Sequence, residues 1–228
     1  MNVIVGSSRS RDLGKFEPLK SNPTVEIWSV PGGKYCQLTV SVDEHMLYHH
    51  GGPMPPTEKT HFYIVAGLCN ITKKINRRQE KYTEVIYDQI PAETARNTIQ
   101  EIQNLKTYIL AQKAVPIFCT IIPSHISTQN NKWFDQGITS SLHFSHRYED
   151  MQSGAMEAIN IVNDKIPIIN SETGVSTPFL HQTITHRKDK KDQRRYQFSL
   201  LRDGCHAGDR AHNLWAKCIG KAIVLNRS

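Results

Sequence analysis

Short apolar runs that end at turn residues alternate along the chain with segments of helical periodicity. Four runs have the length of a strand and are typical of strands buried on both faces: residues 2–5, 24–30, 61–66 and 115–122. Other segments place apolar residues three or four positions apart, as one face of a helix requires: residues 35–47, 91–113 and 148–162. A last helix is expected after Asp209, because aspartate commonly caps helix N-termini.

This alternation of strands and helices predicts the fold class. Strands separated by helices form a mainly parallel sheet with helices on both faces, which is a three-layer α/β sandwich. The length of 228 residues suits a single domain over 1–228. Ligands of such sheets bind at the carboxyl ends of the strands. Three predicted strands end there in small residues, at Gly6-Ser7-Ser8, Gly32-Gly33 and Gly67, so we expect the functional site at this edge.

Composition narrows the class of protein. Hydrophobic residues make up 38 % of the chain and charged residues 21 %, which is typical of globular rather than disordered proteins. The five cysteines are odd in number and irregularly spaced, which predicts reduced thiols in an intracellular setting rather than disulfides or structural zinc. Neither a secretory signal nor an apolar run of about 20 residues is visible.

The formal net charge of +7 favours anionic partners such as nucleic acid. Basic residues gather in residues 72–81 and 186–195, and the predicted fold places both segments beside the carboxyl edge of the sheet. We expect a basic collar that binds phosphates, made of Arg9, Arg11, Lys73, Lys74, Arg77, Arg78, Arg187, Lys188, Lys190, Lys191, Arg194 and Arg195. The alternative is two solvated surface loops, and no motif of sequence-specific nucleic-acid recognition is present.

The histidines give little indication of a metal. His45 and His49 lie four residues apart on a predicted helix, which is a spacing that can bind a metal. The HExxH pattern is absent, however, and no third ligand is evident. We therefore predict neither a metal nor another cofactor.

Ser8 and the pair Asp203 and His206 are the candidates for chemistry. Ser8 follows a strand and a glycine, where its hydroxyl can point to the carboxyl edge of the sheet beside free backbone N–H groups. Asp203 and His206 are three residues apart, so the carboxylate can orient the imidazole as a base for a serine elsewhere. The alternatives are a helix-capping serine, a turn aspartate and a surface histidine.

Four blocks, taken together and in order, resemble the SGNH (GDSL-like) hydrolase family. They are Gly6-Ser7-Ser8, Pro31-Gly32-Gly33, Gly67-Leu68-Cys69-Asn70 and Asp203-Gly204-Cys205-His206, and each occurs at the place in the chain that the family uses. The resemblance implies a flavodoxin-like fold, Ser8 as nucleophile, His206 as general base and Asp203 as its orienting acid. It further implies an oxyanion hole formed by the N–H groups of Ser8 and of Gly32 or Gly33.

Two positions depart from the family pattern. Ser7 stands where the first block usually has aspartate, and Cys69 stands where the family has its oxyanion asparagine. A thiol is a weak hydrogen-bond donor. Asn70, one residue later, could serve only if the loop is shifted by one position.

Two functions from different classes follow. The first is a serine esterase that cleaves a small acyl ester through an acyl-enzyme. The second is a catalytically weakened domain that binds nucleic acid or a protein. Residues 159–178 and the run Leu200-Leu201-Arg202-Asp203 also resemble SGNH-like domains of animal retroelements, which implies an intracellular place near nucleic acid.

Overall fold

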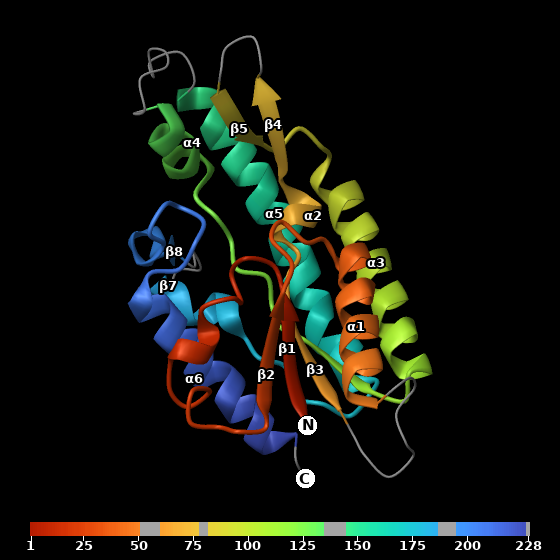
Figure 1. Ribbon diagram of the computed structural model, residues 1–228. Coiled ribbons are helices and arrows are strands. Elements are labelled where there is room, and N and C mark those ends of the chain that lie inside the picture. Colours follow the sequence, from red (N-terminus) through yellow and green to blue (C-terminus); the bar gives the residue numbers. More distant parts are fainter. Residues whose placement is uncertain (51–59, 78–81, 135–144, 187–194, 227–228) are drawn as a thin grey trace.

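A four-stranded parallel sheet forms the centre of the computed structural model, which describes residues 1–50, 60–77, 82–134, 145–186 and 195–226 (Figure 1). The strand order is β2-β1-β3-β6 and all three pairings are parallel. The strands are β1 (Asn2–Gly6), β2 (Val25–Ser29), β3 (His61–Val65) and β6 (Val115–Phe118). The four predicted strands are confirmed, although β6 is shorter than the predicted run.

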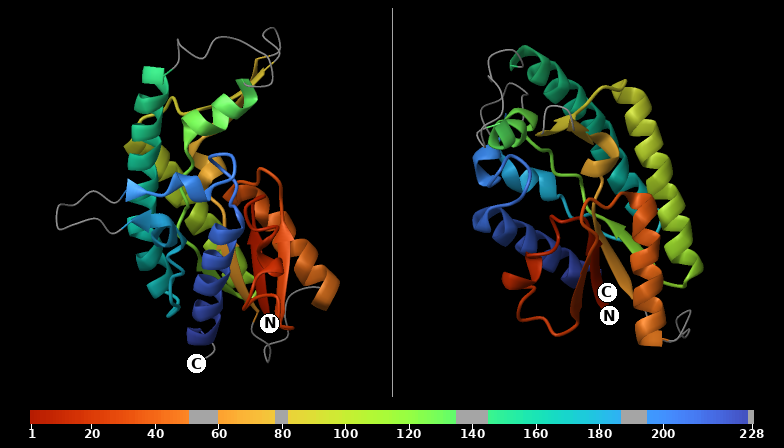
Figure 2. Two further views of the ribbon diagram at one scale, coloured as in Figure 1. Left: turned by 90° about the vertical axis from the view of Figure 1, so that its left-hand side faces the viewer. Right: turned by 45° about the horizontal axis from the view of Figure 1, so that its top comes forward.

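Helices cover both faces of the sheet, so the predicted three-layer α/β sandwich is confirmed (Figure 1 and Figure 2). One face packs on α1 (Leu38–His50), α3 (Pro91–Ala111) and α5 (Ser145–Ser171). The other packs on α6 (Asp209–Leu225) and two 3₁₀ turns, η1 (Leu13–Lys15) and η4 (Leu180–Ile184). Alternate residues of each strand enter the two cores, because successive side chains point to opposite faces.

Several elements differ from the prediction. The basic segment 72–81 contains β4 (Lys73–Arg77), which pairs antiparallel with β5 (Tyr82–Ile86), and neither strand was predicted. Short helices α2 (Leu68–Ile71) and α4 (Ile126–Phe134) were not expected. The hairpin and α4 lie beyond the carboxyl ends of the sheet strands (Figure 1). The remaining elements are η2 (Tyr35–Gln37), β7 (Thr185–His186), β8 (Arg195–Tyr196) and η5 (Phe198–Leu200).

Two asparagines of α5 cover the edge of the sheet at β6. The Asn170 amide accepts from the Phe118 N–H at 3.0 Å and donates to the Phe118 carbonyl at 2.9 Å. Asn163, two helical turns earlier, makes the same pair of bonds to Ile121 at 2.6 and 2.9 Å. The helix thus satisfies backbone groups that an edge strand would otherwise leave unpaired.

Within the part of the chain that the structure describes, no helix has both the length and the apolar character needed to cross a bilayer.

Candidate active site

Ser8 lies in a tight turn at the carboxyl end of β1, the second strand of the sheet. A Cβ on Gly6 would lie 2.3 Å from the Val65 carbonyl oxygen, so this position requires glycine. The turn is held by the Ser7 N–H, which donates to Val65 at 3.1 Å, and by the Ser10 N–H, which donates to the Ser7 carbonyl at 3.0 Å. Ser8 is half-buried, and its own N–H has no hydrogen-bond partner among the described residues.

Asp203 and His206 lie in a short loop just before α6. The loop is closed by a bridge between Leu201 and Ala207. Asp203 shapes it from within, because its Oδ1 accepts from the N–H groups of Cys205 at 3.0 Å and His206 at 2.6 Å. Gly204 has φ +74° and lies against the start of α4, where the His125 N–H donates to its carbonyl at 2.6 Å. The sequence analysis did not single out His125, and no motif marks this contact.

The three predicted catalytic side chains form one chain of hydrogen bonds. His206 Nδ1 lies 2.8 Å from Asp203 Oδ2, and His206 Nε2 lies 3.2 Å from Ser8 Oγ. A carboxylate only accepts hydrogen bonds, so the ring proton is on Nδ1 and Nε2 is the acceptor that faces the serine. The fold therefore brings together residues 198 positions apart in the geometry that a nucleophile, a base and an orienting acid require.

The electrostatics of Asp203 suit this arrangement. Burial alone would raise the pKa of the Asp203 carboxyl, but hydrogen bonds from the His206 ring and from the His206 and Cys205 N–H groups outweigh it. The net result is a pKa well below the usual range for aspartate. Asp203 is thus a carboxylate over the working pH range of most proteins, and it can stabilise an imidazolium at His206.

The two glycines of the second block differ in their backbone bonds. Val30 donates its N–H to the Gly6 carbonyl at 2.8 Å, which holds the turn after β2 next to the Ser8 turn. The Gly33 N–H donates to the Val30 carbonyl at 2.9 Å and is therefore engaged. Gly32 has φ +70°, and its N–H has no partner among the described residues. Of the two glycines, Gly32 is the one whose N–H is free to meet an oxyanion.

Asn70 is bonded away from the oxyanion position. Its amide N–H donates to Glu101 Oε2 at 2.6 Å, and its oxygen accepts from the Tyr35 N–H at 3.2 Å. The oxygen and one N–H of the Asn70 amide are thus engaged, and the role of Asn70 as an oxyanion donor stays a prediction. Its neighbour Cys69 is half-buried, and burial is the first cause of a raised pKa of its thiol. A neutral thiol occupies this position.

The basic residues divide into two groups. The prediction that Arg9 belongs to an exposed collar is wrong, because the side chain is buried between the Ser8 turn and Cys205. Arg11 and Lys74 are exposed, and Lys73 forms a half-exposed ion pair with Asp88 at 3.4 Å. The side chains of Arg77, Arg78, Arg187, Lys188, Lys190, Lys191, Arg194 and Arg195 lie outside the described part, so their share of the collar stays a prediction.

His45 is a core residue in the structure. It is fully buried, with its ring edge-on to Trp28 and Phe62 and its Nδ1 3.5 Å from Glu26 Oε2. The side chain of His49 is not described. Among the described residues, no group of three or more His, Cys, Asp or Glu is placed to hold a metal ion.

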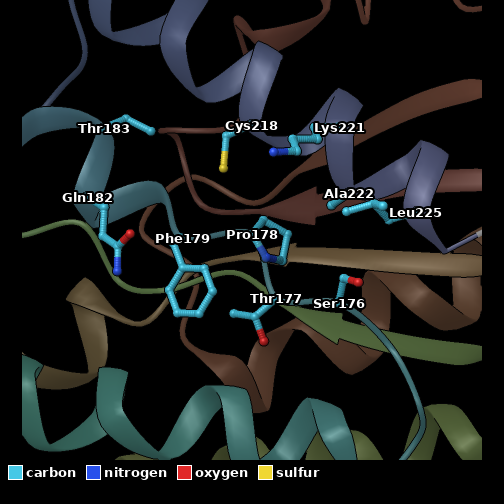
Figure 3. A pocket seen from close by; sticks show the side chains of 10 residues that line it. All are labelled: Ser176, Thr177, Pro178, Phe179, Gln182, Thr183, Cys218, Lys221, Ala222 and Leu225. Carbon is cyan, nitrogen blue, oxygen red and sulfur yellow. The ribbon is translucent and has the colours of Figure 1, made fainter.

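A separate pocket of about 640 Å³ lies between the C-terminal half of α6 and the segment before η4 (Figure 3). Pro178, Phe179 and Leu225 supply apolar walls, and Cys218 and Lys221 contribute polar atoms. None of Ser8, Asp203 and His206 lines it. The pocket is therefore distinct from the candidate active site.

Comparisons with known proteins agree with this architecture. No protein-family model and no curated protein matches the sequence. Among solved structures, a GDSL-like lipase from Bacteroides thetaiotaomicron superposes with a TM-score of 0.60 at 15 % identity, over 98 % of this chain and 87 % of that one. An acetyl xylan esterase, AlAXEase, superposes with a TM-score of 0.55 at 14 % identity, over 98 % of this chain and 100 % of that one. Likeness at these identities establishes the fold, and the chain has the α/β fold of the SGNH (GDSL-like) hydrolases.

Proposed function

We propose that residues 1–228 form a single SGNH-type serine hydrolase domain that cleaves a small acyl ester through an acyl-enzyme. The observation that carries the proposal is the continuous hydrogen-bond chain from Asp203 through His206 to Ser8. A surface histidine and a capping serine have no reason to meet across 198 residues in this order. The two compared structures, which share this fold, are described as a lipase and an esterase.

The proposed reaction follows from the positions of these groups. The Ser8 hydroxyl gives its proton to His206 Nε2 while Oγ bonds to the ester carbonyl carbon, and the carbonyl oxygen becomes an oxyanion. The N–H groups of Ser8 and Gly32 are the backbone donors available to that oxyanion. Collapse of the intermediate breaks the bond to the alcohol, which leaves with the proton from His206. Water, deprotonated by His206, then attacks the acyl carbon. The bond from that carbon to Ser8 Oγ breaks, His206 returns the proton to Oγ, and the acid is released.

The test is labelling with a fluorophosphonate probe, followed by mass mapping of the adduct. We expect the wild type to be labelled at Ser8, Ser8→Ala to be unlabelled, and His206→Ala to be labelled far more slowly. Ser21→Ala, an exposed serine bonded to Glu17, is the matched control and should label as the wild type does. A well-folded wild type that neither labels nor hydrolyses short acyl esters would contradict the proposal.

Binding of a polyanion is the second candidate function. It is favoured by the formal net charge of +7 and by exposed Arg11, Lys74, Arg202 and Arg210 at or near the carboxyl edge of the sheet. We expect retention on heparin that weakens steeply with salt. Replacement of Arg187, Lys188, Lys190 and Lys191 by glutamine should shorten that retention. Unchanged retention would remove this basic segment from the proposal.

The finer resemblance to SGNH-like domains of animal retroelements is kept as a proposal, together with the intracellular setting that it implies. Its support is the sequence of residues 159–178 and of the run before Asp203. Binding of the purified protein to single-stranded RNA, measured over a salt series, would test whether nucleic acid is a partner. Absence of any salt-sensitive binding would count against the lineage and the partner together.

A further inference from the structure

The side chain of Arg9 is buried next to Ser8, and it has no counter-ion among the described residues. Only 5 % of the residue is exposed, although arginine is among the residue types least often buried. Its Nη1 donates to the Ile122 carbonyl, and its Nη2 donates to Cys205 Sγ at 3.4 Å. Its Nε–H has no partner, and no carboxylate of a described residue forms an ion pair with it.

Such an arrangement is expected to lower the stability of the fold. A buried charge normally has an oppositely charged partner, because removing the charge from water is unfavourable. A carbonyl oxygen and a thiol supply only neutral acceptors. Buried charges without such a partner are expected at functional sites, where the charge acts on a ligand or a reacting group rather than on the stability of the fold.

The guanidinium joins the parts of the candidate active site. Arg9 follows Ser8 directly and belongs to the same turn. Cys205 precedes His206 directly and belongs to the loop of the base. Ile122 follows β6 and belongs to the same core cluster as Leu201 and Ala207, which close that loop. One side chain therefore ties the turn of the nucleophile to the loop of the base.

The charge of Arg9 also acts on Cys69, which occupies the position of the missing oxyanion amide. Burial and the neighbouring Cys205 raise the pKa of the Cys69 thiol, and Arg9 and Lys34 oppose that rise. Arg9 and Leu68, the residue before Cys69, line the same small cavity, so the guanidinium lies close to the Cys69 segment. A fixed positive charge in a buried wall attracts an oxyanion far more strongly than the same charge in water.

We propose that Arg9 is a positioning residue of this site, which holds the Ser8 turn against the His206 loop and supplies positive charge that offsets the amide donor absent at Cys69. The inference rests on the proposed hydrolase function. Because the negative charge develops only in the transition state, the effect should fall on kcat rather than on KM.

The test compares variants of Arg9 with a variant of an exposed arginine. Arg9→Met removes the charge and keeps the length, and Arg9→Lys keeps the charge without the planar group. With a neutral p-nitrophenyl ester we expect Arg9→Met to lower kcat by about 10²-fold with little change in KM. Arg9→Lys should lose about tenfold less than Arg9→Met. Arg96→Met, at an exposed arginine of α3, is the control and should leave kcat unchanged.

A second measurement does not depend on hydrolysis. The rate at which iodoacetamide alkylates Cys69, mapped by mass spectrometry over a pH series, reports the charge near the thiol. We expect Arg9→Met to shift this profile to higher pH and Arg9→Lys to leave it in place. Arg9→Gln, which keeps hydrogen-bonding groups without the charge, replaces Arg9→Met if the methionine variant does not fold.

The outcomes separate this inference from the function on which it rests. A wild type that neither labels nor hydrolyses would overturn the hydrolase proposal and with it the role of Arg9, even if the Cys69 profile shifts. An active wild type whose Arg9 variants leave both kcat and the Cys69 profile unchanged would overturn the inference alone. Equal losses of kcat in the lysine and methionine variants, with an unmoved Cys69 profile, would also overturn it, because Arg9 would then act only through structure.

Discussion

At the scale of single residues, Asp203 combines a structural task with the catalytic task proposed for it. One of its oxygens accepts two backbone N–H groups of its own loop, and the other accepts from the His206 ring. Asp203→Asn would replace one of these two accepting oxygens with an NH2 group, which cannot accept a hydrogen bond. We expect kcat to fall by about 10³–10⁴-fold, because the imidazole loses the partner that fixes its tautomer. Steady-state hydrolysis of a short acyl ester measures this, and a loss below tenfold would contradict the role of Asp203.

The same residue predicts a pH dependence of stability. Its folded-state pKa lies below the ordinary value of 3.8, so the folded protein binds this proton less readily than the unfolded chain. The resulting stabilisation is fully present above about pH 4–5 and is lost as the pH falls through the lowered pKa. Urea unfolding should show Asp203→Asn to be about 1–3 kcal/mol less stable than the wild type at neutral pH. The difference should shrink in acid, and a difference that grows in acid would contradict this assignment.

In the proposed reaction, the thiol of Cys69 limits how well the oxyanion is stabilised. A thiol donates weakly, and the neighbouring Asn70 amide is already bonded to Glu101 and Tyr35. Cys69→Asn should therefore raise kcat, by up to about 10²-fold if the new amide reaches the oxyanion. Cys69→Ala removes the thiol without adding a donor and is the matched control. Equal kcat values for the two variants would show that no donor acts from this position.

The three side chains of the Asp203–His206–Ser8 hydrogen-bond chain could be predicted from the sequence, but the rest of the candidate site could not. Ser8, Asp203 and His206 lie in ordered motifs, and each motif follows or precedes a recognisable element. The orientation of Asn70 depends on Glu101, which lies 31 residues away on another helix. The burial of Arg9 depends on Cys205, 196 residues away. Neither contact leaves a local pattern, so Arg9 was assigned to the basic collar from its place just after Ser8 in the sequence.

At the scale of elements, Asn163 and Asn170 of α5 replace a missing neighbour strand beside β6. Each amide pairs with both backbone groups of one residue, Ile121 or Phe118. Asn163→Ala or Asn170→Ala would leave a buried N–H and a buried carbonyl unpaired. Each substitution should lower the free energy of unfolding by about 2–4 kcal/mol, measured by urea denaturation. Asn104→Ala, at an exposed position of α3, is the control. Decreases in the free energy of unfolding no larger than that of the control would contradict this role.

The elements that the sequence predicted correctly are those whose pattern is set by burial. Strands buried on both faces read as continuous apolar runs, so the four strands of the sheet were found. The hairpin of β4 and β5 was missed because its basic strand lacks such a run. Asn130 of α4 instead anchors it by bonding both backbone groups of Val85 at 2.8 Å. The helix α5 was predicted to end at residue 162, yet it continues past Pro167 to Ser171, where packing outweighs the local penalty of proline.

At the scale of the whole molecule, the candidate active site exists only when both ends of the chain are packed on the sheet. Ser8 follows β1, and His206 lies just before α6. Trp215 of α6 is fully buried in the core between that helix and the sheet. Separation of α6 from the sheet would therefore separate the base from the nucleophile. The start of β1 and the end of α6 lie at the same end of the molecule (Figure 1), so the two terminal segments share one core.

This dependence predicts that the site and the core are lost together on unfolding. A variant with Trp28→Phe and Trp133→Phe keeps Trp215 as the only tryptophan of the three and reports the packing of α6. In a urea series, the emission of Trp215 and short-pulse fluorophosphonate labelling of Ser8 should fall in one transition, because both require α6 to be docked. Labelling that disappears at lower urea than the Trp215 change would contradict this coupling. The Asp203–His206 loop would then open on its own while α6 stays in place, and the contacts of Arg9 and His125 with that loop would be too weak to hold it.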